Sequence, residues 1–316
     1  MESINVNTEY QEKTGYAHGI YTTLSGDRSS FLDRARTASQ ITIPSLLPEQ
    51  GHSGSSILPT PYQSIGAEGV NNLASKLLLS LLPPNAPFFR LVINDSELEA
   101  LVAGQRGEVE ETLAKIERMV TQEIEVRALR VPISEALKQL LIAGNVLLYL
   151  PPTEQMRVFR LDRYVVKRDS MGNVLKIVIK ESLSPLSLPE NAKKLLPEVQ
   201  EDEVPMGNVD LYTCVTWTGK NWTILQELEG EIVPGSEGSY PKNKSPFLAL
   251  RFTHIDGEDY GRGFVEEYIG DLKSLETLTK AIVEGSAAAA KVLFLVRPNG
   301  TTRIKTLADS PNGAIV

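Results

Sequence analysis

The sequence predicts an α+β fold, and three observations support this prediction. Amphipathic helical patterns dominate the first 145 residues, alternating apolar and polar residues dominate residues 146–253, and one long helical pattern covers residues 264–290. A run of helices followed by a strand-rich block and a further helix is typical of α+β proteins.

The beginning of the chain carries the weaker signals. Residues 1–27 are polar and are expected to be loosely ordered or extended. Residues 25–40 can form a helix that carries Arg28, Arg34 and Arg36. Glycine, serine and proline between residues 50 and 61 indicate a loop.

Stronger helical patterns follow. Residues 62–82 have apolar side chains at helical spacing, and Pro83-Pro84 ends the helix. Residues 88–93 are expected to form a strand. Residues 107–130 predict a charged helix with one apolar face. A further helix is expected from Pro132 to Leu141, closed by Gly144-Asn145.

The strand-rich block begins with a buried strand at residues 146–150. Further strands are expected at residues 158–161, 164–168, 174–180, 209–217, 222–228 and 247–252. Turn residues at 169–173 and 219–221 predict two hairpins. Residues 183–205 are charged and interrupted by proline, so they are expected to form an exposed excursion.

The last pattern is a glycine hinge, Gly261-Arg262-Gly263, that opens into an uninterrupted helix over residues 264–290. Such a helix would be about 40 Å long and needs partners along its length. Its apolar stripe consists of Ile269, Leu272, Leu275, Leu278 and Ile282. Its far end is rich in alanine, which allows close approach of backbones. It is either an ordinary core helix or a helix that packs against copies of itself in a ring.

Composition limits the classes of protein. Hydrophobic residues make up 41% and charged residues 23%, which is normal for a folded soluble protein. No run approaches about 18 consecutive apolar residues, so no membrane span is expected. The polar, acidic first ten residues are unlike a secretory signal. The net charge of −8 disfavours tight sequence-specific DNA binding but is compatible with a surface past which DNA slides.

The sequence predicts no metal site and no cofactor. Cys214 is the single cysteine, which excludes an intrachain disulfide and a zinc cluster and suits a reducing compartment. It lies among apolar residues in an expected strand and is interpreted as a buried, inert thiol. The three histidines are far apart in the sequence.

Signatures of catalysis are missing, so the chain is not expected to be an enzyme. There is no P-loop and no Gly-x-Ser-x-Gly elbow, and Gly261-Arg262-Gly263 lacks the third glycine of a dinucleotide fingerprint. One arguable metal set remains for a nucleic-acid enzyme: Asp256, Glu258, Asp259 and Lys273. An acidic hinge loop is the plainer explanation of the first three.

Several blocks of sequence carry a resemblance to a known family. They are 41–46, 69–77, 135–140, 143–151, 168–169 with 172–175, 238–241, 260–262 and 266–272. Together and in this order they resemble the portal (head-to-tail connector) proteins of short-tailed, podovirus-type bacteriophages.

The resemblance implies a dodecameric ring at one vertex of the capsid. Such a ring nucleates head assembly, docks the terminase motor, forms the channel for packaging and ejection of DNA, and then attaches the tail. The implied partners are capsid and scaffolding proteins, the terminase large subunit, a tail adaptor protein, and double-stranded DNA bound without sequence specificity. The implied location is the portal vertex of the virion, after assembly in the host cytoplasm.

The resemblance also implies a division of the chain. Residues 1–260 correspond to the wing, helical over 25–145 and β-rich over 146–253. Residues 261–291 correspond to the hinge and first stem helix, and residues 292–316 to the start of a small α/β clip. The sequence would then stop before the second stem helix and the crown.

Candidate site residues follow from this division. Those expected to face the channel or DNA are Lys273, Lys280, Glu284, Arg297, Arg303 and Lys305. Those expected to pack between subunits are Leu272, Leu275, Ala287 and Ala288. The last three basic residues of the first group, around Pro298-Asn299-Gly300, could also form a solvated hairpin. A tail adaptor ring that is not a portal, and a metal-dependent nucleic-acid enzyme, remain as alternatives.

Overall fold

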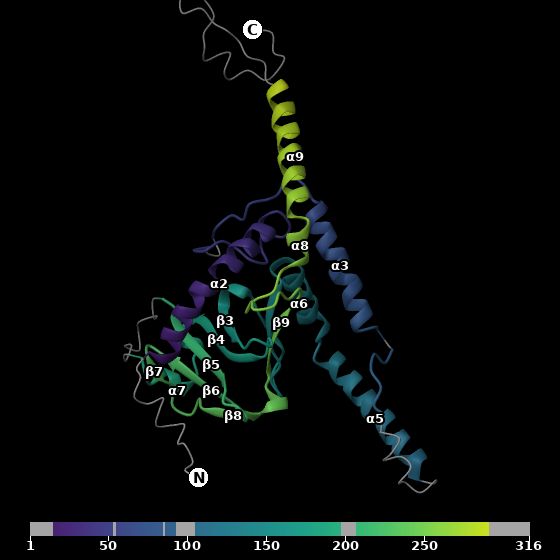
Figure 1. Cartoon of the computed structure of the whole chain (residues 1–316), viewed down its shortest axis with the longest axis vertical. Helices are drawn as coiled ribbons and strands as arrows, with labels where there is room; N and C mark the ends of the chain where they lie inside the picture. Colours follow the sequence, from purple (N-terminus) through teal and green to yellow (C-terminus); the bar gives the residue numbers. More distant parts are fainter. Residues whose placement is uncertain (1–14, 53–54, 85, 93–104, 197–206, 291–316) are drawn as a thin grey trace, which may run out of the picture.

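A computed structural model describes residues 15–52, 55–84, 86–92, 105–196 and 207–290, and it confirms a mixed α+β fold. Figure 1 shows a block of β-strands crossed by a helix, a helical arm that extends away from the block, and a last helix that projects in the opposite direction. No helix in these ranges is long and apolar enough to cross a bilayer.

Most strands of the block form one antiparallel sheet. Its order is β3 (Tyr164–Arg168), β4 (Val174–Leu183), β5 (Val209–Trp217), β6 (Asn221–Leu228) and β7 (Glu231–Ile232), and β8 (Gly238–Pro241) also pairs with β6. Both predicted hairpins are confirmed. In the first turn, the Asp169 carboxylate accepts hydrogen bonds from the amides of Met171 and Asn173 at 3.0 and 2.7 Å. In the second, Trp217 lies opposite Trp222, with ring centroids 5.2 Å apart.

A second sheet joins strands from distant parts of the chain. Its order is β2 (Arg157–Phe159), β1 (Asn145–Tyr149) and β9 (Phe247–Arg251), all antiparallel, with Leu147 opposite Ala249. Short 3-10 turns occupy Leu161–Arg163 (η1), Pro185–Ser187 (η2) and Lys242–Lys244 (η3). The β1–β9 pairing brings the end of the helical region next to the residues that precede the last helix.

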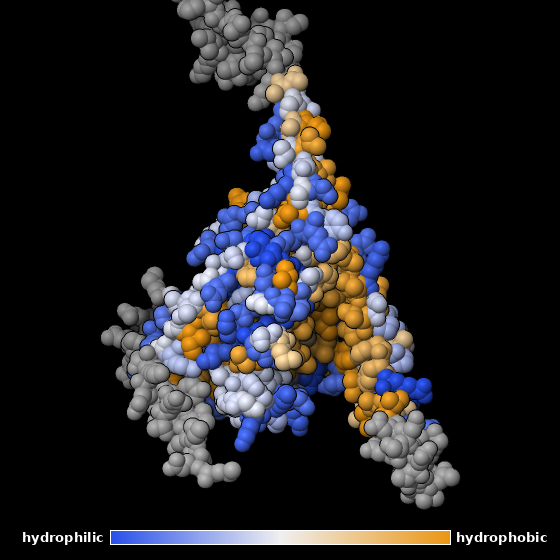
Figure 2. Space-filling view, viewed as in Figure 1, coloured by the Kyte–Doolittle hydropathy of each residue, from blue (hydrophilic) through white to orange (hydrophobic). Residues whose placement is uncertain are grey.

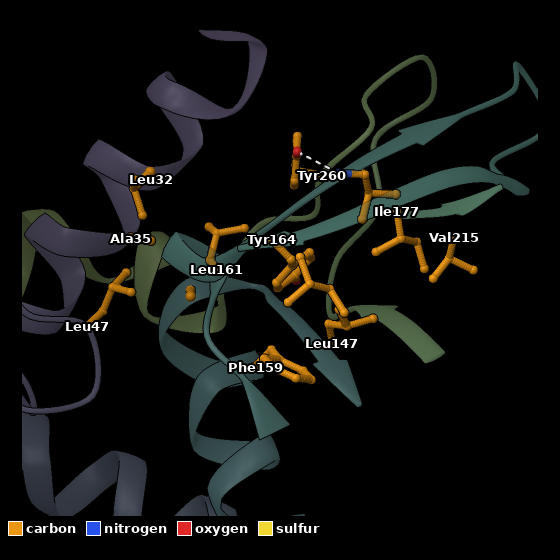
Figure 3. Packing of buried hydrophobic residues seen from close by; sticks show 13 residues of the cluster. Leu32, Ala35, Leu47, Leu147, Phe159, Leu161, Tyr164, Ile177, Val215 and Tyr260 are labelled. Atoms are coloured by element: carbon orange, nitrogen blue, oxygen red, sulfur yellow. Dashed lines mark hydrogen bonds between the residues drawn. The ribbon is translucent and has the colours of Figure 1, made fainter. Parts of the chain in front are cut away.

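The core follows the twofold alternation of the strands. In β3, Tyr164 and Val166 pack in the main cluster with Leu147 and Phe159, whereas Val165 points to the other face and packs against the N-terminal helix. Figure 3 shows the main cluster, which draws residues from both sheets and from the N-terminal helix. Cys214 belongs to the second cluster, is buried, and has a pKa raised by that burial, as expected of an inert thiol.

The N-terminal helix, α2 (Tyr16–Gln40), begins nine residues earlier than the predicted start at residue 25. Its first amides are capped by a buried carboxylate from β6. Glu227 accepts hydrogen bonds from the backbone N–H groups of Ala17 and His18 at 2.6 and 3.1 Å. The start of a helix needs acceptors for its free amides. Here the acceptor lies about 210 residues away in the sequence, so the residues near Tyr16 did not indicate that a helix begins there.

The arm consists of α3 (Ile65–Leu81), α5 (Gln105–Val126) and the described residues between them, 82–84 and 86–92. Both predicted helices are confirmed, and α6 (Arg130–Ala143) follows them and ends at Gly144 as expected. The predicted strand at residues 88–93 is wrong over 88–92, which have no regular structure; residue 93 lies outside the described residues. A strand needs a neighbour, and among the described residues no other strand lies along the arm.

The expected excursion at residues 183–205 is partly wrong. Within its described part, α7 (Glu190–Lys193) folds back on the sheet, and Leu188 and Ala192 are buried against Leu211 and Leu228. Apolar packing therefore holds a segment whose prolines and charges indicated exposure. Residues 197–206 lie outside the described residues.

The last helix is not continuous, contrary to the prediction for residues 264–290. It consists of α8 (Phe264–Glu267) and α9 (Ile269–Ala289), separated at Tyr268, where φ is −107° and ψ is 9°. The break lies where the chain leaves the core, because Val265 of α8 is buried in the helical cluster. At about 1.5 Å per residue, α9 is about 31 Å long.

Two buried tyrosines in the core make the stability of the fold sensitive to alkaline pH. Tyr164 and Tyr260 are 1% and 2% exposed, and the Tyr260 hydroxyl accepts a hydrogen bond from the Val166 amide at 3.0 Å. Burial raises the pKa of Tyr260 to about 12 and also raises that of Tyr164. The unfolded chain releases these protons near pH 10, earlier than the native chain. Stability is therefore full below pH 10 and falls as pH rises toward 12.

We expect the free energy of unfolding to fall between pH 10 and 12 by about 1.4 kcal/mol per pH unit for each tyrosine. Urea unfolding at several pH values measures this slope. Tyr260→Phe should flatten it, whereas Tyr268→Phe, at a residue 48% exposed, should leave it unchanged. Equal slopes in the two variants would contradict the prediction.

Candidate functional site

Helix α9 projects from the rest of the molecule almost without cover. None of its residues is buried (Figure 1), its first turns pack against the helical cluster, and its further contacts in the described structure are with Tyr62 and Gln63. In proteins, most of the stability of a helix comes from the packing of its apolar face. The helix therefore needs lateral partners.

Two opposite faces of α9 differ in chemistry. At about 100° per residue, Lys273, Lys280 and Glu284 fall within about 40° of one another. Leu278 and Ile282 lie on the far side of the helix and are 62% and 67% exposed. One face of the helix is thus charged and the other is an apolar stripe open to solvent.

The charged face meets the residues that lead into the arm. Glu276 accepts hydrogen bonds from the backbone amides of Tyr62 and Gln63 at 2.9 and 3.2 Å. The Tyr62 hydroxyl lies 3.5 Å from Glu284, and Lys280 lies 3.9 Å from Glu284 and 5.9 Å from the centre of the Tyr62 ring. Lys280 and Glu284 are therefore engaged within the chain.

The residues predicted to pack between subunits do not share one face. Leu272 is half-buried and packs against the helical cluster of its own chain, and Leu275 is also half-buried. Ala287 and Ala288 are exposed and lie nearer the charged face than the apolar stripe. Arg297, Arg303 and Lys305 lie outside the described residues.

The base of the projecting helix is fixed by an unusually close approach of two backbones. We call residues 142–145 and 260–266 the junction. A Cβ on Gly263 would lie well inside van der Waals contact with the carbonyl oxygen of Ile142, and one on Gly144 would overlap the backbone of Arg262. A Cβ on Gly261 would lie 2.8 Å from the Gly144 carbonyl oxygen.

This corrects the interpretation of the glycine hinge. A glycine hinge before a helix normally supplies the backbone angles that the turn requires. Gly263 instead has an ordinary φ of −78°. The glycines are required because the backbone at Gly261 and Gly263 lies against the end of α6, with no room for a methyl group between them.

Asn145 locks the junction. Its side-chain amide donates to the carbonyl oxygens of Ala143 and Gly261 at 2.9 and 2.8 Å, and its side-chain oxygen accepts from the Gly261 amide at 2.7 Å. The residue is 2% exposed. Buried, fully satisfied amides of this kind fix one arrangement, because any other leaves polar groups without partners. The sequence pattern placed Asn145 only at the end of a helix and gave no sign of its contact with Gly261.

An ion-pair network clamps α8 to α2. The Arg262 guanidinium lies 2.8 Å from Glu258 and 2.9 Å from Glu266, and Glu266 also lies 3.3 Å from Arg34 of α2. The hydrogen bonds to Glu258, which has the larger effect, and to Glu266 raise the pKa of Arg262. The network holds the start of the projecting helix against the body of the protein.

Two of the three acidic residues considered as a metal set, Glu258 and Asp259, are engaged in ion pairs within the chain. The Asp259 carboxylate lies 2.8 Å from the Lys167 ammonium group and accepts a hydrogen bond from the backbone amide of Arg168 at 2.7 Å. Glu258 forms an ion pair with Arg262. Among the described residues no group of three or more His, Cys, Asp or Glu side chains could hold a metal ion. Asp259 therefore connects its loop to β3, and Glu258 connects the same loop to Arg262 of the junction.

The arm is a second surface without a partner. Figure 2 shows apolar side chains along it and along α9. The exposed large apolar residues of the arm are Ile65, Leu79, Leu81, Phe88, Leu91, Val92, Ile116, Met119, Val120 and Val126. Large apolar patches of this kind mark protein interaction sites.

Comparison with known proteins gives consistent matches along the chain. A family model described as "Bacteriophage head to tail connecting protein" matches residues 15–315. The portal protein of Escherichia phage T7 is 40% identical over 319 residues, which cover 97% of this chain and 59% of that protein. The portal protein of Enterobacteria phage T3 is 40% identical, covering 95% and 57%, and that of Pseudomonas phage phiKMV is 32% identical, covering 83% and 53%. The chain thus spans less than two thirds of the length of these relatives.

Proposed function

Because the chain belongs to the bacteriophage head-to-tail connecting protein family, we propose that it is a subunit of a portal ring at the capsid vertex. In this role it nucleates head assembly, docks the terminase motor and forms the channel for DNA packaging and ejection, and it then attaches the tail. The proposed ring is dodecameric and acts without catalysis.

One observation carries the proposal: helix α9 projects with an apolar stripe exposed on one side and charges on the other. Within the described part of the chain, the Leu278 and Ile282 end of this stripe remains largely exposed. Copies of the same helix arranged around an axis would bury each stripe against a neighbour and leave the charged faces open. The exposed apolar residues of the arm give each copy a second surface of contact.

The division of the chain into parts is included in the proposal. We assign residues 1–260 to a wing, 261–291 to a hinge and first stem helix, and 292–316 to the start of a clip. The junction supports the boundary near residue 261, because there the chain leaves the core between two packed backbones and starts the projecting helix.

The charged face of α9 is proposed to face the channel, together with Arg297, Arg303 and Lys305. Lys273 is the best residue on which to test this, since its side chain makes no ion pair among the described residues. Lys273→Glu should leave ring assembly intact and change the rate of DNA packaging. If Lys273→Glu and the unchanged protein package DNA at the same rate, Lys273 does not face the channel.

The proposed partners are capsid and scaffolding proteins, the terminase large subunit, a tail adaptor and double-stranded DNA bound without sequence specificity. The proposed location is the portal vertex of the virion, reached after assembly in the host cytoplasm. A tail adaptor ring is less well supported, because the relatives are named portal proteins. A metal-dependent enzyme is disfavoured by the ion pairs of Glu258 and Asp259.

Native mass spectrometry and electron microscopy of the protein test the proposal. We expect a closed ring of about a dozen subunits with a hole along its axis. A species that stays monomeric or dimeric at all concentrations and salt conditions would reject it.

A further inference from the structure

A cavity of about 550 Å³ lies beside helix α2. Its walls come from α2, from residues 48–52, from η1 and its flanking residues, and from β4. The size falls within the range of small-ligand sites, which is about 300–1,000 Å³.

The lining of the cavity is rich in positive charge although the chain as a whole is acidic. It contains the cationic side chains Arg28, Arg36, Arg160, Arg163 and Lys180, and the two carboxylates Glu49 and Asp162. The cations therefore outnumber the carboxylates by three. The net charge of the chain is −8, so this accumulation is local.

The carboxylates near the cavity balance only part of its positive charge. Asp162 lies 3.1 Å from Arg160 and 3.8 Å from Arg163, and Lys180 pairs with Asp210 at 2.7 Å. Glu49 accepts a hydrogen bond from Gln40. Within the described ranges, Arg28 and Arg36 have no carboxylate within ion-pair distance.

Arg28 is the most unusual member. Its side chain is 6% exposed, and its Nη1 group donates to the carbonyl oxygens of Leu161 and Tyr164 at 3.0 and 2.6 Å. Its Nε–H is buried without an acceptor in the described structure, and so is that of Arg36. A buried guanidinium without a counter-charge is costly, and an anion in the cavity would supply that charge to Arg28.

We propose that this cavity binds a phosphate group, either as the free ion or at the end of a small phosphate ester. Guanidinium groups present paired donors that match the oxygens of a phosphate. A phosphate carries up to two charges at neutral pH, which suits the excess of cations better than a single carboxylate does. The bound anion would connect α2 to residues 48–52 and to η1, and so would stabilise the wing.

Calorimetric titration of the protein in phosphate-free buffer at constant ionic strength tests the proposal. Inorganic phosphate should bind at one site per chain and raise the melting temperature by a few degrees in a saturable manner. Sodium acetate should bind much more weakly. Ribose 5-phosphate distinguishes the two sources, since tighter binding than phosphate assigns the site to an ester and weaker binding to the free ion.

Arg36→Gln should weaken phosphate binding by about tenfold or more. Arg118→Gln, which removes an exposed arginine from α5, should leave it unchanged. If Arg36→Gln does not fold, Arg163→Gln provides the same comparison at a more exposed residue. Unchanged binding by the folded cavity variant would overturn the proposal. Equal affinity for acetate, or stabilisation by phosphate that does not saturate, would also overturn it.

Discussion

Replacing Ile282 by aspartate is expected to convert the proposed ring into folded single chains. Ile282 is 67% exposed in the isolated chain, so the change removes little packing within it and the fold should remain intact. In a ring the same side chain would be buried against a neighbour. An unpaired carboxylate there costs several kcal/mol at every interface of the ring, which is enough to prevent closure.

The measurement is the mass of the particle in solution, by light scattering after size exclusion and by native mass spectrometry. Circular dichroism confirms that the variant is folded. Thr277→Asp is the matched control, because Thr277 is exposed on the other side of the same helix and tolerates charge there. If Ile282→Asp forms rings as readily as Thr277→Asp, the apolar stripe is not a subunit interface.

Replacing Gly263 by alanine is expected to destabilise the chain by about 2–4 kcal/mol. The added methyl group would overlap the carbonyl oxygen of Ile142, and backbone atoms cannot move aside as a flexible side chain can. The junction would have to open, which strains the three hydrogen bonds of Asn145. Urea unfolding followed by circular dichroism measures the loss.

Gly270→Ala provides the control for this experiment. Gly270 lies in the first turn of α9, and a Cβ there would meet nothing within 4 Å. Alanine in a helix is favoured over glycine by about 0.5–1 kcal/mol, so this variant should be equally or more stable. A Gly263→Ala variant as stable as Gly270→Ala would mean that the backbones in the junction are not in close contact.

The junction explains how a projecting helix can keep a defined direction. Asn145 joins the end of α6 to Gly261, and Arg262 joins α8 to Glu258 and Glu266. Single surface ion pairs contribute little, about 0–1 kcal/mol, so the buried amide and the packed glycines carry most of the constraint. The break at Tyr268 then sets where the free part of the helix begins.

The sequence alone determined most of the elements and the family. Hairpins at residues 169–173 and 219–221, the end of α6 at Gly144 and the end of α3 before Pro83 follow from local rules, because turn residues and prolines act on the backbone near them. The apolar stripe of α9 was also readable, since helical spacing depends only on nearby residues. The blocks of resemblance predicted the family that the family model matches.

The tertiary structure decided what depends on residues far apart in the sequence. The start of α2 is set by Glu227, the roles of Gly261 and Gly263 by the backbone of α6, and the partners of Asp259 by β3. Each of these is a contact between segments that are about 90–210 residues apart. Local patterns specify which element a segment forms, but a cap, a close approach or an ion pair depends on which surface the fold brings beside it.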